Sequence, residues 1–301
     1  MNPSADCTQM ISSAFRPAAS YLLAGEPSLP DGVDWVLVAD SDVGPMWTHP
    51  DDIVVGHTLR ESGTWDPGEG RFLRSVLRPG MNVIDIGANI GYFTLLMARA
   101  VSTQGRVLAV EAEPINFQIL RTNIDLNQME NVEVIPVAAH RCPGLTSVAR
   151  DLHNHGASIA FNLAAPWYGT PTQAVRLDDV LNPGCQIHFI KIDIEGMDHA
   201  AVQGLEQTIR RWKPTLLVEL NPAKTELFGD SPNEVLRLYR ELGLSIRLLG
   251  ADALRLHRDA GMAVESLLLN ELYVTPDWEA ELIERTRHID YVNLLLDHGS
   301  A

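Results

Sequence analysis

Predicted strands that alternate with predicted helices are the feature that most constrains the fold of this chain. From Met81 onward, short apolar runs such as NVIDIG and RVLAVEAEP are each followed by a stretch with helical spacing of its apolar residues. This alternation predicts βαβ units, which build a mostly parallel sheet. VLAV and TLLVEL are nearly continuous apolar runs, as expected of strands that are covered on both faces. We therefore predict a doubly wound, Rossmann-like α/β fold.

The N-terminal part of the chain lacks this alternation. Residues 1–32 are rich in Ala, Ser and Pro and predict a loosely attached arm, with one helix over Thr8–Leu23. Residues 34–40 predict a strand in a small β region, and residues 68–78 show one helical face. We expect an N-terminal arm and small β extension over residues 1–66, and the α/β domain over residues 67–301.

The C-terminal part continues the alternation. SPNEVLRLYRELG opens with a Ser cap and closes with Gly243, which is typical of a helix. SIRLLG, ALRLHR and NELYVTP predict three strands, antiparallel because their connections are short. Residues 277–296 predict a final helix, whose apolar face we assign to the core or to a homodimer contact.

The charge of the chain argues against two classes of partner. There are 39 acidic and 23 basic residues, which give a net charge of −16. A protein that binds nucleic acid usually presents a basic face, and an anionic membrane surface likewise attracts basic segments. We therefore expect neither nucleic acid nor a membrane among the partners.

The cysteines and the hydropathy pattern favour the cytoplasm. Cys7, Cys142 and Cys185 are odd in number and form no CxxC pair. This argues against a disulfide scaffold or a structural zinc site. No apolar run approaches the ~18 residues of a membrane helix, and the first residues do not predict a signal peptide.

The segment DIGANIG, from Asp85 to Gly91, is the strongest chemical signal. It lies where the first strand of the βαβ series turns into a helix, and a glycine there lets the backbone approach a ligand closely. A dinucleotide-binding turn would read G-x-G-x-x-G, whereas Asn89 replaces the second glycine here. Asp85 could accept a hydrogen bond from an ammonium group, which suits an amino-acid cofactor better than a pyrophosphate. A tight turn without a ligand is the alternative.

Glu111 ends the second predicted strand of the series. An acid at this position is placed to bind both hydroxyls of a ribose and disfavours a 2′-phosphate. The alternative is a carboxylate that faces solvent. The next strand, NVEVIPVAA, would border an adenine through Val137, Ala138 or Ala139.

Several segments together resemble one family. DIGANIGYFTLL, AVEAEP, NVEVIPVAA, RLDDVL, FIKIDIEGMDHAAVQGL and KPTLLVELNP look like the FkbM-type S-adenosylmethionine-dependent methyltransferases, and ESGTWDP resembles the region upstream of their cofactor motif. The resemblance implies transfer of a methyl group from S-adenosylmethionine, usually to a hydroxyl of a sugar, polyketide or other secondary metabolite. The residues expected to bind this cofactor are Asp85, Gly87, Asn89, Gly91, Thr94, Glu111 and Ala138. Thr94 is included because Tyr92, Phe93 and Thr94 open a helix whose free N–H groups favour a carboxylate.

The segment KIDIEG places three ionisable residues, Lys191, Asp193 and Glu195, at the end of another predicted strand. Ligands bind at this edge in open α/β sheets, and strand alternation puts the three side chains on one face. We take Lys191, Asp193 and Glu195 as candidate catalytic residues, with one carboxylate as the general base. The carboxylates could instead ligate a divalent ion, and a purely structural ion pair is a further alternative.

The stretch from Asp151 to Thr172 is long for a connection and is rich in histidine and aromatic residues. His155 is our third candidate for the base, although a solvated loop fits the sequence equally well. His199 and His57 are weaker candidates, and Glu219 is a weak candidate for the substrate pocket. Asp178 and Asp179 begin a short helix, where capping is the expected role.

We predict that the protein catalyses O-methylation of a small-molecule or glycan acceptor. A nicotinamide-dependent oxidoreductase is the rival enzyme class, against which Asn89 counts. A catalytically silent relative that binds a partner protein is the rival outside enzymes, and the charged residues of KIDIEG argue against it.

Overall fold

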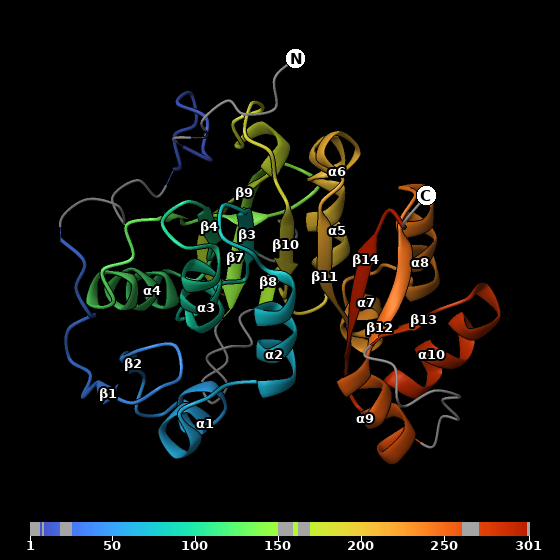
Figure 1. Ribbon diagram of the computed structural model, residues 1–301, viewed down its shortest axis with the longest axis horizontal. Coiled ribbons are helices and arrows are strands. Elements are labelled where there is room, and N and C mark those ends of the chain that lie inside the picture. The colour runs from blue at the N-terminus through green and yellow to red at the C-terminus, as the bar shows by residue number, and fades with distance from the viewer. Residues whose placement is uncertain are drawn as a thin grey trace.

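The computed structural model describes residues 7, 9–18, 26–149, 159–161, 169–260 and 271–299. In this part of the chain an eight-stranded sheet runs through the molecule in the order β13-β12-β14-β11-β10-β3-β4-β5 (Figure 1). Its strands are β3 Asn82–Ile86, β4 Arg106–Val110, β5 Val132–Ile135, β10 Phe189–Ile192, β11 Thr215–Leu220, β12 Ser245–Leu249, β13 Glu271–Tyr273 and β14 Val292–Asp297. From β5 to β11 all neighbours are parallel, whereas β14, β12 and β13 pair antiparallel. The predicted doubly wound, mostly parallel sheet is confirmed.

Helices cover both faces of this sheet, as the apolar strands require. Alternate residues of β3 belong to different cores: Val83 packs with α2 and α3, whereas Ile84 and Ile86 pack with α5, α6 and α8. The helices are α1 Val55–Ser62, α2 Pro67–Val76, α3 Tyr92–Val101, α4 Pro114–Leu126, α5 Asp198–Gln203, α6 Glu206–Trp212, α7 Pro222–Leu227, α8 Pro232–Glu241, α9 Gly250–Ala260 and α10 Glu279–Thr286. None of the described helices is both long enough and apolar enough to cross a bilayer.

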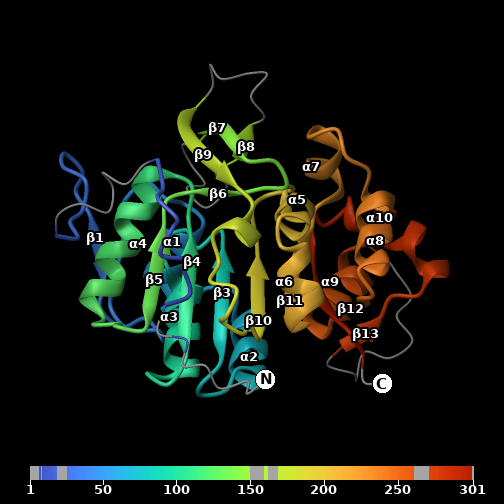
Figure 2. The same cartoon turned by 90° about the horizontal axis from the view of Figure 1, so that it is seen from above.

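Two smaller sheets flank the main one. The predicted small β extension is the antiparallel hairpin of β1 Val36–Val38 and β2 Met46–Thr48. A second sheet, with order β6-β9-β7-β8, lies at one end of the main strands (Figure 2). Its strands are β6 Ala138–Ala139, β7 Gly144–Ala149, β8 Ile159–Phe161 and β9 Thr170–Val175. NVEVIPVAA is thus not one strand: it is divided at Pro136, which has no N–H group to donate to a sheet, between β5 and β6.

The N-terminal arm is fastened to the main domain, contrary to the expectation of loose attachment. Cys7 forms a disulfide with Cys185, 178 residues further along the chain. Met10 donates its backbone N–H to the Glu133 carboxylate over 2.8 Å, and Ile11 forms a β-bridge with Leu181. The described residues 9–18 contain no helix. The disulfide also removes the ground on which the cysteines favoured a reducing compartment, because sequence spacing cannot show which distant cysteines meet.

Two C-terminal predictions are wrong. ALRLHR belongs to α9, where Ala253 and Leu256 are buried one helical turn apart. The final predicted helix over 277–296 ends with α10, and its last residues form β14 between β11 and β12. Asp290 separates the two elements with a φ of 70°, a left-handed conformation that a helix cannot continue through.

Candidate active site

The turns that follow β3 and β10 lie against each other at the carboxyl edge of the sheet. Gly87 has a φ of 81° and Asn89 a φ of 51°, a left-handed region that glycine and asparagine tolerate best. A Cβ atom on Gly87 would lie 1.9 Å from the backbone carbonyl oxygen of Asp193. Glycine is therefore required for the two turns to approach this closely.

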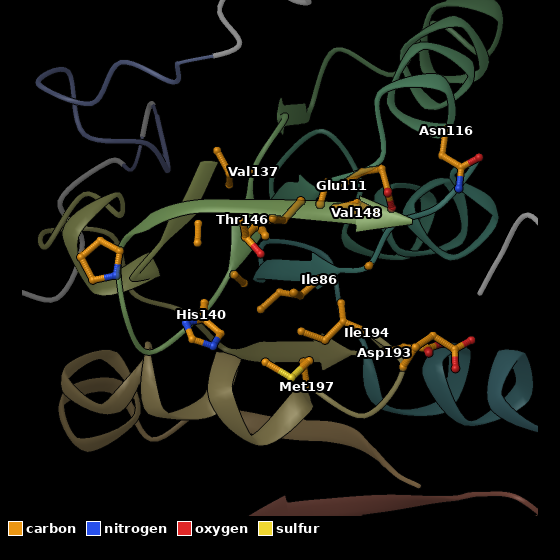
Figure 3. A pocket seen from close by; sticks show the side chains of 18 of the residues that line it. Ile86, Glu111, Asn116, Val137, His140, Thr146, Val148, Asp193, Ile194 and Met197 are labelled. Atoms are coloured by element: carbon orange, nitrogen blue, oxygen red, sulfur yellow. The ribbon is translucent and has the colours of Figure 1, made fainter. Parts of the chain in front are cut away.

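A first cavity, of about 110 Å³, opens on one side of these turns. Figure 3 shows apolar side chains around it, among them Ile86, Val137, Val148, Ile194 and Met197. The predicted Ala138 lines it from β6, and the polar lining residues include Glu111, Asn116, His140 and Thr146. An apolar pocket with few polar groups suits a flat heterocycle joined to a polar ring.

Glu111 joins this cavity to the DIGANIG turn. Its carboxylate accepts one hydrogen bond from the backbone N–H of Asn89 and one from that of Glu113, both over 2.8 Å. Burial raises the pKa of Glu111 to about 7, although these hydrogen bonds oppose the shift. Because each carboxylate oxygen has two lone pairs, Glu111 can still accept from ribose hydroxyls.

A second cavity, of about 200 Å³, opens on the other side of the turns. Both cavities are lined by Gly87, Asn89, Asp193 and Glu195, so they meet at these four residues. The second cavity is acidic and aromatic. Its charged lining residues are Asp66, Glu69, Asp85, Lys191, Asp193, Glu195 and Glu219, and its aromatic ones are Trp65, Tyr92, Phe93 and Tyr291.

Lys191 lies buried in the wall of the second cavity. Its Nζ is 2.9 Å from Asp193 Oδ2 and 3.7 Å from Glu69 Oε1, and it lies 4.8 Å from the ring centroid of Phe93. Burial alone would lower the pKa of Lys191, but the charges of Asp193, Glu69 and Asp85 outweigh it and raise that pKa above the usual value. Lys191 is therefore a fixed positive charge and not a base.

Asp85 is fully buried below the turn. Its Oδ2 accepts a hydrogen bond from the Thr94 hydroxyl over 2.6 Å, whereas its Oδ1 has no hydrogen-bond partner among the described residues. Burial raises the pKa of Asp85, although Lys191 and Thr94 lower it. Thr94 is itself fully buried and belongs to neither cavity lining, so it acts through Asp85.

Two further acids in the second cavity are strongly perturbed. Burial raises the pKa of Glu69 to about 8, against the opposing charge of Lys191. Burial and the nearby charges of Asp193 and Asp198 also raise the pKa of Glu219. Glu219 was a weak sequence candidate, whereas Glu69 was missed. Helix α2 reads as an ordinary amphipathic helix, and no sequence signal shows that Glu69 faces Lys191.

The turn after β10 does not keep the strand alternation that placed three side chains on one face. The strand ends at Ile192, and Glu195 has a φ of 60°. Glu195 forms an ion pair with Lys224 of α7, while Asp193 stays with Lys191. Asp198, which sequence reasoning also missed, shapes this turn. Its carboxylate accepts from the backbone N–H groups of Ile194 and Gly196 over 3.2 Å and 3.0 Å.

Three further sequence candidates that the structure describes, Gly91, His199 and His57, line neither cavity. Gly91 is the N-cap of α3, and a Cβ atom there would lie 2.7 Å from Leu120 Cδ1, so the glycine lets α3 pack closely against α4. His199 is buried and bonds through Nε2 to Asp230 Oδ2 over 2.9 Å, and His57 is exposed. His155 lies outside the described residues, as do His153, Asn154, Trp167 and Tyr168.

The described ranges contain no cluster of side chains that supports the predicted alternative of a metal site. There, no three or more His, Cys, Asp or Glu side chains are grouped so that they could hold a metal ion. The residues around Gly87 fit an organic cation with a nucleoside part. Asp85 has a free buried oxygen for an ammonium group, Glu111 stands where a ribose would lie, and Gly87 leaves room for the chain between them.

Comparison with known families agrees with this description. The model of the methyltransferase FkbM domain matches residues 85–246, which is more than half of the chain. "Methyltransferase 1" of Beauveria bassiana (strain ARSEF 2860) is 27% identical over 168 residues, 47% of this chain and 65% of that protein. A catechol O-methyltransferase of Niastella koreensis is 30% identical over 94 residues, 29% of this chain and 42% of that protein. This chain thus spans less than two thirds of each of these relatives.

A solved structure, methyltransferase FkbM from Methylobacillus flagellatus KT, is similar with a TM-score of 0.36 and 21% identity, covering 56% of this chain and 44% of that one. An O-methyltransferase from Bacillus cereus gives a TM-score of 0.41 and 17% identity, covering 78% of this chain and 82% of that one.

Proposed function

From the premise that this chain belongs to the FkbM methyltransferase family, we propose that it transfers a methyl group from S-adenosylmethionine to a hydroxyl oxygen of a small-molecule or glycan acceptor. The family match covers the DIGANIG and KIDIEG turns that build the site. The part of the chain over residues 67–301 would be the methyltransferase domain, with residues 1–66 as its extension. When bound, the cofactor supplies an electrophilic methyl group.

The cofactor's two halves fit the residues on either side of Gly87. The adenosine belongs in the first cavity, with Glu111 accepting from the ribose hydroxyls and Ala138 beside the adenine. The methionine ammonium belongs at Asp85, whose Oδ1 has no hydrogen-bond partner in the described chain. The sulfonium would then lie near Gly87 and Asn89, where the cavities meet.

One observation carries the proposal: the two cavities meet at Asp193. Methyl transfer needs a site where cofactor and acceptor touch in line, so that catalysis is mainly proximity and alignment. Asp193 lines both cavities, and Lys191 holds its carboxylate over 2.9 Å. Asp193 would accept the proton of the acceptor hydroxyl, which is the general-base role. Glu195 lines both cavities too, but its carboxylate is paired with Lys224.

Hydroxyl oxygen is the favoured acceptor atom for two reasons. A carboxylate base is suited to removing the proton of a hydroxyl as the oxygen attacks. The relative from Niastella koreensis, which matches 29% of this chain, is a catechol O-methyltransferase, and this supports oxygen as the acceptor atom. Asn89 stands where a dinucleotide-binding turn has its second glycine, which counts against a nicotinamide cofactor.

Calorimetric titration with S-adenosylmethionine, with NADH as control, tests the cofactor. Saturable binding of S-adenosylmethionine that is lost in Glu111→Ala supports the proposal, and binding of NADH alone contradicts it. A panel of hydroxylated compounds then serves to detect release of S-adenosylhomocysteine.

The Asp193→Asn variant tests the base. We expect turnover to fall by about 10²- to 10⁴-fold, the usual contribution of a general base. The affinity for S-adenosylmethionine should change little, because we assign the hydrogen bonds of the cofactor to Asp85 and Glu111 and not to the Asp193 carboxylate. Asp179→Asn, which changes an exposed aspartate outside both cavities, is the control. Unchanged turnover in Asp193→Asn would exclude this assignment.

A further inference from the structure

The second cavity has more carboxylates than the cofactor and the protein can neutralise. Asp193 is paired with Lys191, and Glu195 is paired with Lys224. Asp85 is the residue assigned to the cofactor's ammonium group. Asp66 caps α2, where its Oδ1 accepts from the backbone N–H of Glu69 over 2.9 Å. Glu69 from α2 and Glu219 from β11 then remain in the wall of the cavity.

Both of these acids are deeply buried and incompletely bonded. Glu69 is 5% exposed and Glu219 is 7% exposed. Glu69 Oε1 and Glu219 Oε1 have no hydrogen-bond partner within the described part of the chain. The nearest cation to Glu69 is Lys191, at 3.7 Å, and Lys191 already holds Asp193 at 2.9 Å. Burying a carboxyl oxygen that lacks a hydrogen bond costs stability, so a ligand is expected to supply one to each of these two oxygens.

The lining residues of the second cavity carry more negative than positive charge, so a ligand that balances them would have to be positively charged. Lys191 is the one Lys or Arg among the lining residues that the structure describes, against six Asp and Glu. Four aromatic rings complete the wall: Trp65, Tyr92, Phe93 and Tyr291. Aromatic faces attract ammonium groups through cation–π interactions, and Phe93 already has the Lys191 ammonium beside it at 4.8 Å.

We infer that the acceptor carries a protonated amine, which binds between Glu69 and Glu219 while a neighbouring hydroxyl faces Asp193. This inference rests on the proposed function, because it names the class of substrate for the same site. A hydroxylated amine, such as an amino sugar, an aminocyclitol or an amino alcohol, is the class that satisfies both the free carboxyl oxygens and the aromatic wall. The raised pKa values of Glu69 and Glu219 agree, since a bound cation would restore their ionised forms.

The test compares hydroxylated amines with their N-acetylated forms. The probes are ethanolamine, glucosamine and 2-deoxystreptamine, each paired with its fully N-acetylated derivative, which keeps the hydroxyls and loses the charge; for 2-deoxystreptamine, which has two amines, this is the di-N-acetyl derivative. The protein is first saturated with S-adenosylhomocysteine, and each probe is then titrated at constant ionic strength. We expect at least one amine to bind at least tenfold more tightly than its N-acetyl derivative.

Two variants locate the binding site of the amine. Glu69→Gln and Glu219→Gln keep the shape of each side chain and remove its charge, and each should weaken binding of the amine by about tenfold. Glu234→Gln, on the exposed surface of α8, should bind the amine as the unmodified protein does. Each variant is checked for binding of S-adenosylhomocysteine, which shows that it is folded.

The outcomes separate this inference from the proposed function. If S-adenosylhomocysteine binds but no amine binds more tightly than its N-acetyl form, the inference is overturned and the proposed function stands. An amine preference that survives in both Gln variants would also overturn it. If neither S-adenosylmethionine nor S-adenosylhomocysteine binds, the proposed function itself fails.

Discussion

Gly80 and Gly87 have nearly the same backbone conformation in very different surroundings. Their φ angles are 87° and 81°. A Cβ atom on Gly80 would meet nothing within 4 Å, whereas one on Gly87 would lie 1.9 Å from the Asp193 carbonyl oxygen. Substitutions at the two positions therefore distinguish the effect of backbone strain alone from the effect of a clash between the two turns of the site.

We expect Gly87→Ala to weaken binding of S-adenosylmethionine by at least tenfold, because the two turns must move apart. Gly80→Ala should lower the free energy of unfolding by about 1 kcal/mol, the cost of a left-handed non-glycine residue, and keep the affinity. Isothermal titration measures both affinities. Equal affinities in the two variants would show that the close approach of the turns is not needed.

Single residues were predictable from sequence where they belong to a turn between two elements. Gly87, Asn89 and Glu111, which the sequence predicts as cofactor-binding residues, all line the first cavity, since the position of such residues follows from the strand order alone. Their contact with the cofactor stays a prediction. Glu69 could not be found this way. Its proximity to Lys191 depends on how α2 packs on the sheet, and that packing has no local signal.

Asp178 caps a helix, as expected, but that helix is α6 and not the short helix in which Asp178 lies. It was expected to cap the short helix in which it lies, Leu177–Asp179. Its carboxylate instead accepts from the backbone N–H groups of Gln207 and Thr208, over 2.8 Å and 2.9 Å, at the start of α6. The Thr208 hydroxyl donates to the same carboxylate over 2.8 Å.

We expect Asp178→Ala to lower the free energy of unfolding by about 1–2 kcal/mol, as loss of a helix cap does. The neighbouring Asp179→Ala removes an exposed carboxylate and should change it by less than about 0.5 kcal/mol. Urea denaturation of the two variants gives both values. A larger effect at Asp179 would contradict the assignment of the cap.

Whole elements followed the sequence best where apolar strands alternate with helices, from β3 to β5 and again from β10 to α8. The predictions failed near the C-terminus, where β14 is a run of buried residues that follows soon after helix α10. A short buried strand and a continued apolar helix face share the same apolar composition. Only the pairing of β14 with β11 and β12 decides between them.

The molecule as a whole carries several acids that are protonated more readily when folded. The pKa of Glu69 is raised to about 8, and those of Glu111 and Asp198 to about 7, in each case mainly by burial. Between the unfolded and folded pKa values the folded state holds more protons, so its stability decreases as pH rises. The buried His199 has a lowered pKa, which acts in the opposite direction only below about pH 6.5.

We therefore expect the ligand-free protein to lose about 1–2 kcal/mol of unfolding free energy between pH 7 and pH 8. Glu69→Gln should reduce that loss, whereas Glu234→Gln should reproduce the full loss. Urea denaturation at the two pH values measures the difference. Equal or greater stability at pH 8 would show that these acids are ionised in the folded protein already at pH 7.

The two strands that pair with β3, namely β4 and β10, are synthesised at very different times during translation. Its partner β4 follows directly, but β10 lies about a hundred residues further along the chain. Until translation passes β10 and the turn after it, the nascent chain lacks Asp193 and Glu195, which help to line both cavities. A chain that terminates early therefore has no complete site, and binding of the ligand reports that translation has passed β10.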